Sequence, residues 1–191
     1  DTIRIEGVEK LHGTDYTVIP DRIVAGTYLL AGAITGGKVT ALNVIPEHLE
    51  SLLAKLREMG VQVTVAGDTV TVQAKHPLQA IDSLRTLPYP GFPTDLQAPM
   101  MALLCLANGT SIVTETVFES RFKHVNELKR MGANIKVNER TAIITGVPAL
   151  SSANVSATDL RAGAALVLAG LAADGITVIE DVHHIYRGYI D

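Results

Sequence analysis

The chain has 191 residues, of which 47% are apolar and 19% are charged, a balance that predicts an ordinary globular domain rather than a disordered or fibrous chain. Its 20 acidic and 16 basic residues leave a net charge of −4, which argues against general attraction to nucleic acid or anionic membrane. Affinity for an anionic ligand must therefore come from locally placed arginine or lysine. The densest apolar stretch, Ala164–Ala173, is about half as long as a membrane span requires. A single cysteine excludes an internal disulfide and fits the cytoplasm, where we expect the protein to act.

Three stretches of the chain resemble one another, beginning at Pro20, Pro93 and Ala157. Each has an aspartate, then a run of small and aliphatic residues, then a glycine followed by β-prone residues. Aspartate is a favoured helix N-cap, and glycine is favoured where a helix ends. The pattern predicts three similar helices. The three aspartates are Asp21, Asp95 and Asp159, and the three glycines are Gly37, Gly109 and Gly175.

A second block, LREMGVQVTV at Leu56 and LKRMGANIKV at Leu128, predicts an amphipathic helix, a Met-Gly stop and a strand. A further strand follows in both copies. The sequence thus predicts an α/β (α+β) domain built of strand-helix-strand-helix-strand-strand units, at about 20–74, 84–147 and 150–191. The third unit stops at RGYID, where a helix should begin, so we expect a piece of a longer protein. Residues 1–19 are interpreted as strands belonging to, or leading from, a preceding domain, with residues 20–191 forming the repeat domain.

Four motifs carry a resemblance to a known family: FPTDLQAPMMA from Phe92, TETVFESRFKHVNELKRMGA from Thr114, ATDLRAGAALVLAGLAADG from Ala157 and HHIYRGY from His183. The chain resembles the UDP-N-acetylglucosamine enolpyruvyl transferases over essentially its whole length. The resemblance implies an inside-out α/β domain of three repeats, the third incomplete here, which closes on its substrates against a similar domain. It also implies transfer of the enolpyruvyl group of phosphoenolpyruvate to the 3-hydroxyl of UDP-N-acetylglucosamine with release of phosphate, without a metal or organic cofactor.

The resemblance also assigns roles to particular residues. Asp95 would face the sugar hydroxyl as a candidate base, with the backbone of Val117 and the side chain of Phe118 beside the sugar nucleotide. Asp159 would support the site. The arginines that match those holding phosphoenolpyruvate are Arg121, Arg161 and Arg187. These residue types suit the chemistry, because an arginine fork binds carboxylate and phosphate bidentately and an alcohol needs a base to accept its proton.

Each assignment has a structural alternative. The three aspartates are also candidate helix caps, and the arginines could be surface or ion-pair residues. Cys105 is expected to be a buried apolar residue rather than a reactive one. His183 and His184 would point apart on a strand, so no metal site is expected. The segment Gly32–Lys38 matches most of a phosphate-binding loop, but Val39 replaces the hydroxyl residue and the segment runs from helix to strand, so we reject that interpretation.

Two functional hypotheses remain open. The chain is part of an enolpyruvyl transferase, inactive without the missing domain that carries the proton donor. Alternatively, it is an isolated repeat domain that binds a nucleotide sugar or an anion without turnover. Neither hypothesis includes a nucleic acid, a membrane or a metal.

Overall fold

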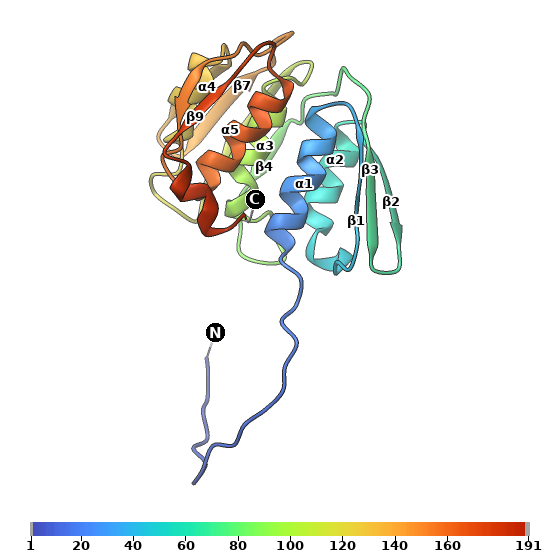
Figure 1. Cartoon of the computed structure of the whole chain (residues 1–191), viewed down its shortest axis with the longest axis vertical. Coiled ribbons are helices and arrows are strands. Elements are labelled where there is room, and N and C mark those ends of the chain that lie inside the picture. Colours follow the sequence, from blue (N-terminus) through green and yellow to red (C-terminus); the bar gives the residue numbers. More distant parts are fainter. Residues whose placement is uncertain (1, 190–191) are drawn as a thin grey trace.

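The computed structural model describes residues 2–189 and contains helices and short strands in the order that the repeats predict (Figure 1). The α-helices are α1 (Arg22–Ile34), α2 (Glu50–Glu58), α3 (Gln97–Leu104), α4 (His124–Arg130) and α5 (Leu160–Ala172). The strands are β1 (Lys38–Ala41), β2 (Gln62–Ala66), β3 (Thr69–Gln73), β4 (Ser83–Arg85), β5 (Thr110–Thr114), β6 (Asn134–Asn138), β7 (Thr141–Thr145), β8 (Asn154–Ser156) and β9 (Val178–Glu180). Short 3₁₀ segments are η1 (Pro46–His48), η2 (Thr94–Leu96) and η3 (Val182–Arg187).

The second unit is the most complete of the three, running β4-α3-β5-α4-β6-β7. Its strands form one sheet in the order β4-β5-β7-β6, in which β4 and β5 are parallel and the other pairs are antiparallel. The first unit repeats this sheet as β1-β3-β2, without an opening strand in the described part of the chain. The third unit contributes the parallel pair β8-β9. The predicted strand-helix-strand-helix-strand-strand unit is therefore confirmed in its second copy.

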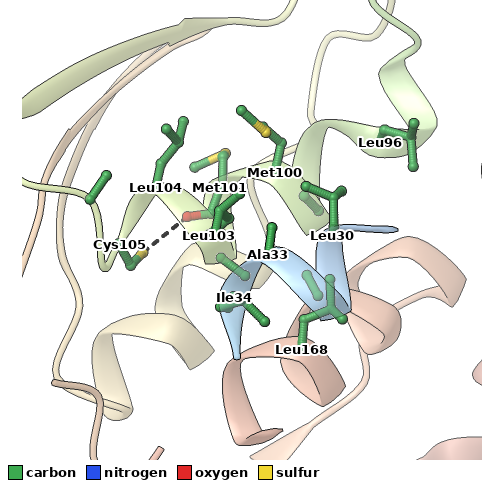
Figure 2. Close-up of a cluster of buried hydrophobic side chains, with 14 of the residues drawn as sticks. Leu30, Ala33, Ile34, Leu96, Met100, Met101, Leu103, Leu104, Cys105 and Leu168 are labelled. Carbon is green, nitrogen blue, oxygen red and sulfur yellow. Dashed lines mark hydrogen bonds between the residues drawn. The ribbon is translucent and has the colours of Figure 1, made fainter. Parts of the chain in front are cut away.

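The first helix of each unit lies in the interior of the domain, and the sheets lie outside. Helix α3 packs against both α1 and α5, and all eight of its residues are buried. Figure 2 shows side chains of α1 (Leu30, Ala33), α3 (Met100, Leu103) and α5 (Leu168) meeting in this core. A helix that is apolar all round is stable only when it is surrounded by protein, as α3 is. This is the inside-out arrangement expected from the resemblance.

Turns at the helix ends follow the repeated sequence. Gly60 and Gly132, the glycines of the two Met-Gly stops, have positive φ angles of 91° and 90°, which glycine adopts without a Cβ clash. The carboxylate of Asp21 accepts hydrogen bonds from the backbone N–H groups of Ile23 and Val24 at the start of α1. The cap predicted for the first helix is confirmed.

Residues 2–20 contain no helix or strand and are exposed throughout. In Figure 1 this segment runs away from the repeat domain, which begins at α1. The strands expected within residues 1–19 are thus not formed in the described part of the segment, and residue 1 lies outside the described residues. The assignment of this segment to a preceding domain stays a prediction.

Further details of the sequence analysis can be compared with the structure. Cys105 is fully buried, its thiol donates to the carbonyl of Met101 at 3.1 Å (Figure 2), and burial raises its pKa to about 12, so it is an unreactive core residue as predicted. The expected strand at His183 and His184 is wrong: both lie in η3 with ring centroids 4.1 Å apart. No cluster of three metal-binding side chains occurs among residues 2–189. In the same range, no helix is long and apolar enough to cross a membrane.

Candidate functional site

A cleft of about 810 Å³ lies where η2, the loop after β5, the start of α5 and η3 come together. All seven residues to which the sequence analysis assigned a role line this cleft, although they span more than ninety positions of the chain. They are Asp95, Val117, Phe118, Arg121, Asp159, Arg161 and Arg187. Glu119, Ser120, Lys123 and Leu160 complete the lining. Four cationic side chains face three carboxylates here, so the cleft has a positive excess within an acidic chain.

Asp95 is the centre of the charged cluster. Its Oδ1 accepts a hydrogen bond from Nη2 of Arg121 at 2.6 Å, and its Oδ2 accepts one from Nη2 of Arg161 at 3.1 Å. The carboxylate is 36% exposed and the two arginines are 19% and 16% exposed, so the group is sheltered but open to the cleft. The interpretation of Asp95 as a helix cap is wrong, because it lies inside η2 and Leu96 occupies the N-cap position of α3.

Asp159 supports Arg161 through the backbone. Its Oδ1 accepts hydrogen bonds from the N–H groups of Arg161 and Ala162, both at 2.9 Å, and so caps α5. The cap holds the first turn of α5 and thereby the point from which the Arg161 side chain leaves the helix. Farther along that side chain, Nη1 lies 3.5 Å from the hydroxyl of Tyr189, which also contacts Oγ1 of Thr27 at 2.8 Å. Sequence reasoning did not single out Tyr189.

Arg187 reaches the cleft from η3 and is exposed. No carboxylate within residues 2–189 pairs with its guanidinium. Segment η3 packs closely on α5, because a Cβ on Gly163 would lie 2.6 Å from Cγ1 of Ile185. Glycine at position 163 therefore allows η3 to approach the start of α5, which brings Arg187 to the same cleft as Arg161. Lys123, which no motif argument identified, adds a further cation.

The loop after β5 is organised by Glu115, another residue that sequence reasoning missed. Glu115 is 1% exposed, and its Oε1 accepts hydrogen bonds from the backbone N–H groups of Val117 at 2.8 Å and Phe118 at 3.1 Å. The ring of Phe118 lies under the guanidinium of Arg121, with the central carbon 4.5 Å from the ring centroid. The signal was present in the TETVFE motif, but only the structure places this glutamate in the interior.

His124 begins α4, three residues after Arg121, and is 2% exposed. Burial lowers the pKa of its imidazole to about 4, assisted by the charge of Arg121 and opposed by that of Asp159. Its Nε2 has no hydrogen-bond partner among residues 2–189. The imidazole is therefore neutral at physiological pH and serves as a packing residue behind the cationic cluster.

A second cavity, of about 690 Å³, lies near the C-terminal ends of α1, α3 and α5, at the far end of the central helices from the charged cleft. Its lining includes Ile34, His76, Leu106, Val147 and Leu171 but no arginine, lysine, aspartate or glutamate. Recognition of an anion needs fixed cations, so the charged cleft is the candidate functional site.

Comparison with solved structures defines the class of protein. The enolpyruvyl transferase NikO from Streptomyces tendae has the same fold with a TM-score of 0.81 and 31% identity, over 92% of this chain and 42% of that protein. An EPSP synthase from Acinetobacter baumannii has a TM-score of 0.67 at 20% identity, covering 87% of this chain and 42% of that one, which supports the fold alone. The fold is that of the enolpyruvyl transferases.

The sequence model of EPSP synthase (3-phosphoshikimate 1-carboxyvinyltransferase) matches residues 1–191, and the chain belongs to this family. Among curated relatives, it is 59% identical over 190 residues to UDP-N-acetylglucosamine 1-carboxyvinyltransferase 1 of Caldanaerobacter subterraneus, covering 100% of this chain and 46% of the relative. It is 61% identical over 189 residues to UDP-N-acetylglucosamine 1-carboxyvinyltransferase of Clostridium botulinum, covering 99% and 45%. The chain spans about half the length of the curated relatives it matches.

Proposed function

We propose that this chain supplies one side of the active site of a UDP-N-acetylglucosamine enolpyruvyl transferase, which catalyses the first committed step of peptidoglycan synthesis in the cytoplasm. The substrates are phosphoenolpyruvate and UDP-N-acetylglucosamine. The proposal is supported by the names of the relatives at about 60% identity. The single observation that carries it is the convergence of Asp95 with Arg121, Arg161 and Arg187 in one cleft.

The arginines account for recognition of phosphoenolpyruvate. This small molecule carries a carboxylate and a phosphate, and each group can accept paired hydrogen bonds from a guanidinium. Arg187 has no carboxylate partner in the described chain and is available to an incoming anion. Arg121 and Arg161 are held by Asp95 and sheltered from water, which limits the conformational entropy lost when substrate binds.

Asp95 accounts for activation of the sugar hydroxyl. Each of its oxygens accepts one arginine hydrogen bond and retains a lone pair that can accept another. As the 3-oxygen of the sugar forms a bond to C2 of phosphoenolpyruvate, its proton passes to Asp95, and C3 receives a proton from the other domain. The tetrahedral adduct then loses a proton from C3 and phosphate from C2, which restores the double bond in the product.

The loop at Val117 offers a hydrogen-bond acceptor to the sugar nucleotide. The N–H of Val117 already donates to Glu115, whereas no donor within residues 2–189 reaches its carbonyl. A contact of this backbone with the substrate would therefore use the carbonyl oxygen, which suits a sugar hydroxyl or an amide N–H. Phe118 presents an exposed apolar face beside it.

A chimeric enzyme tests the proposal directly. The matching half of the Caldanaerobacter relative is replaced by this chain, and phosphate release from phosphoenolpyruvate is measured with UDP-N-acetylglucosamine or with shikimate 3-phosphate as acceptor. We expect release with the nucleotide sugar alone. Release only with shikimate 3-phosphate would reassign the acceptor, and no release with either from a folded chimera would contradict the proposal.

The second candidate function is binding without turnover by the chain on its own. The observation that favours it is that the chain spans about half of the length of its relatives and still brings the charged residues together in one cleft. Calorimetric titration of the 191-residue chain with each substrate separates the two. Binding of UDP-N-acetylglucosamine that is abolished by Asp95→Ala, without phosphate release, would describe the isolated chain as a binding domain.

A further inference from the structure

Glu115 is a buried carboxylate that sits behind the candidate active site. It is 1% exposed and accepts four hydrogen bonds. A buried ionised group is costly unless hydrogen bonds satisfy it, and four donors arranged around one carboxylate do so. Such a group stays in place because any displacement would leave several buried or partly buried donors unpaired at once.

The two oxygens of Glu115 bind different elements. Oε1 accepts from the N–H groups of Val117 and Phe118 and from Oγ1 of Thr86 at 2.8 Å, which fixes the loop after β5 against the end of β4. Oε2 accepts from Oγ1 of Thr94 at 2.9 Å. Thr94 opens η2 and directly precedes Asp95. One carboxylate therefore joins the segment that carries the candidate base to the loop that would contact the sugar.

The same two segments meet a second time on the cleft side. Arg121 binds Asp95 at 2.6 Å and stacks over the ring of Phe118. The contacts form a closed ring, from Glu115 through Thr94 and Asp95 to Arg121, and back through Phe118 to Glu115. Glu115 holds the Asp95 segment through Oε2 and the 117–118 loop through Oε1, so the position of the Asp95 carboxylate relative to the Val117 carbonyl depends on Glu115.

We propose that Glu115 is a positioning residue for the part of the site that binds the sugar nucleotide. It sets Asp95 and the 117–118 backbone at the separation that this substrate requires. Glu115 is buried and need not touch substrate; it acts through the two segments that do. The inference rests on the proposed function for the identity of the ligand, whereas the structural coupling stands independently of it. A misplacement of about 1 Å in such a pair is enough to lower the rate on the order of 100-fold.

The first test is amide hydrogen exchange in the 191-residue chain, which needs no ligand. Glu115→Gln keeps the shape but removes the charge, and hydrogen bonds to a charged acceptor are stronger than those to a neutral one. We expect the amides of Val117 and Phe118 to exchange on the order of tenfold faster in Glu115→Gln than in wild type. Glu47→Gln, at an exposed glutamate in η1, is the matched control and should leave both rates unchanged.

A companion variant, Thr94→Val, removes the hydrogen bond to Oε2 alone. Exchange at Val117 and Phe118 should then stay close to wild type, because Oε1 still holds the loop. Unchanged exchange in Glu115→Gln, in a chain that remains folded by circular dichroism, would overturn the proposal. Equal acceleration of all loop amides in Glu115→Gln and Thr94→Val would also overturn it, because the two oxygens would not act separately.

The second test is kinetic and uses the chimera described above. We expect Glu115→Gln to raise the KM for UDP-N-acetylglucosamine and to lower kcat, each roughly tenfold, and Thr94→Val to lower kcat with a smaller effect on that KM. Wild-type kinetics in the Glu115→Gln chimera would contradict the positioning role. An inactive wild-type chimera with altered exchange in Glu115→Gln would instead reject the proposed function and leave the coupling established.

Discussion

An aspartate precedes or begins each of the three central helices, but the partner of its carboxylate differs among them. Asp21 and Asp159 each accept two hydrogen bonds from backbone N–H groups and cap α1 and α5. Asp95 stands at the corresponding place before α3, but it lies inside the 3₁₀ turn η2 and its carboxylate binds Arg121 and Arg161 instead. The comparison teaches that one repeated position can cap a helix in two copies and pair with two arginines of the candidate site in the third. A single extra turn of backbone separates these two roles.

The largest expected effect is on turnover and comes from Asp95→Asn. The amide keeps the volume of the side chain but cannot accept a proton, so the rate of phosphate release in the chimera should fall about 10²–10⁴-fold. The free energy of unfolding should also fall, because the amide weakens the ion pairs with Arg121 and Arg161, although no helix cap is lost. Paired kinetics and chemical denaturation measure both quantities. A loss of stability without a loss of rate would mean that the role of Asp95 is structural, as that of Asp21 is, and that the comparison is wrong.

The amphipathic helices α2 and α4 give a second comparison between the first and second units. His124 occupies the position in α4 that Leu52 occupies in α2, when LKRMG and LREMG are aligned, and both side chains are buried. The folded pKa of His124 is lowered to about 4 from an unfolded value of 6.5, so the fold favours the neutral imidazole. The contribution of the neutral His124 side chain to the free energy of unfolding is therefore fully present above about pH 6.5 and is lost as the pH falls toward 4.

The variant His124→Leu removes this titration and gives α4 the leucine that α2 has at the corresponding position, Leu52. Between pH 6.5 and pH 4, we expect the free energy of unfolding of the wild type to fall by on the order of 3 kcal/mol more than that of His124→Leu. Urea denaturation of both proteins across this range gives the difference, in which the titration of carboxylates common to both cancels. Parallel pH profiles for the two proteins would show that the imidazole is not buried in neutral form.

A smaller, mixed effect is expected for Asp159→Ala. Removal of the cap should cost about 1 kcal/mol of stability. It should also weaken phosphoenolpyruvate binding a few-fold, since the first turn of α5 sets the origin of the Arg161 side chain. Thermal melts and the KM for phosphoenolpyruvate in the chimera measure the two effects. A change in stability with an unchanged KM would limit Asp159 to capping.

The smallest effect is expected for Asp21→Ala, the structural counterpart of Asp159→Ala. It should also cost about 1 kcal/mol of stability. No change in either KM is expected, because Asp21 is absent from the lining of the charged cleft. Together the two variants separate capping from support of the site at equal cost in stability. An altered KM for phosphoenolpyruvate in Asp21→Ala would mean that loosening any central helix perturbs the cleft.

The sequence by itself determined the repeated unit, the caps of α1 and α5 and most of the charged residues that line the candidate site. These features depend on local physics that a short segment carries: the Asp and Gly signals at helix ends, the apolar periodicity, and motifs such as FPTDLQ and TETVFE. The seven residues to which the resemblance assigns roles all line one cleft. The interpretation of Asp95 as a cap and the strand at His183 were wrong, because local signals do not say whether an α or a 3₁₀ turn forms.

Only the tertiary structure decided which side chains became buried or paired across the domain. Glu115 and His124 both lie in the motif that begins at Thr114, yet only the packing of the second unit shows that both are buried behind the cleft. The two arginine partners of Asp95 lie 26 and 66 residues away in the chain. Such contacts depend on how the three units pack around the central helices, and no periodicity or motif within one unit encodes that arrangement.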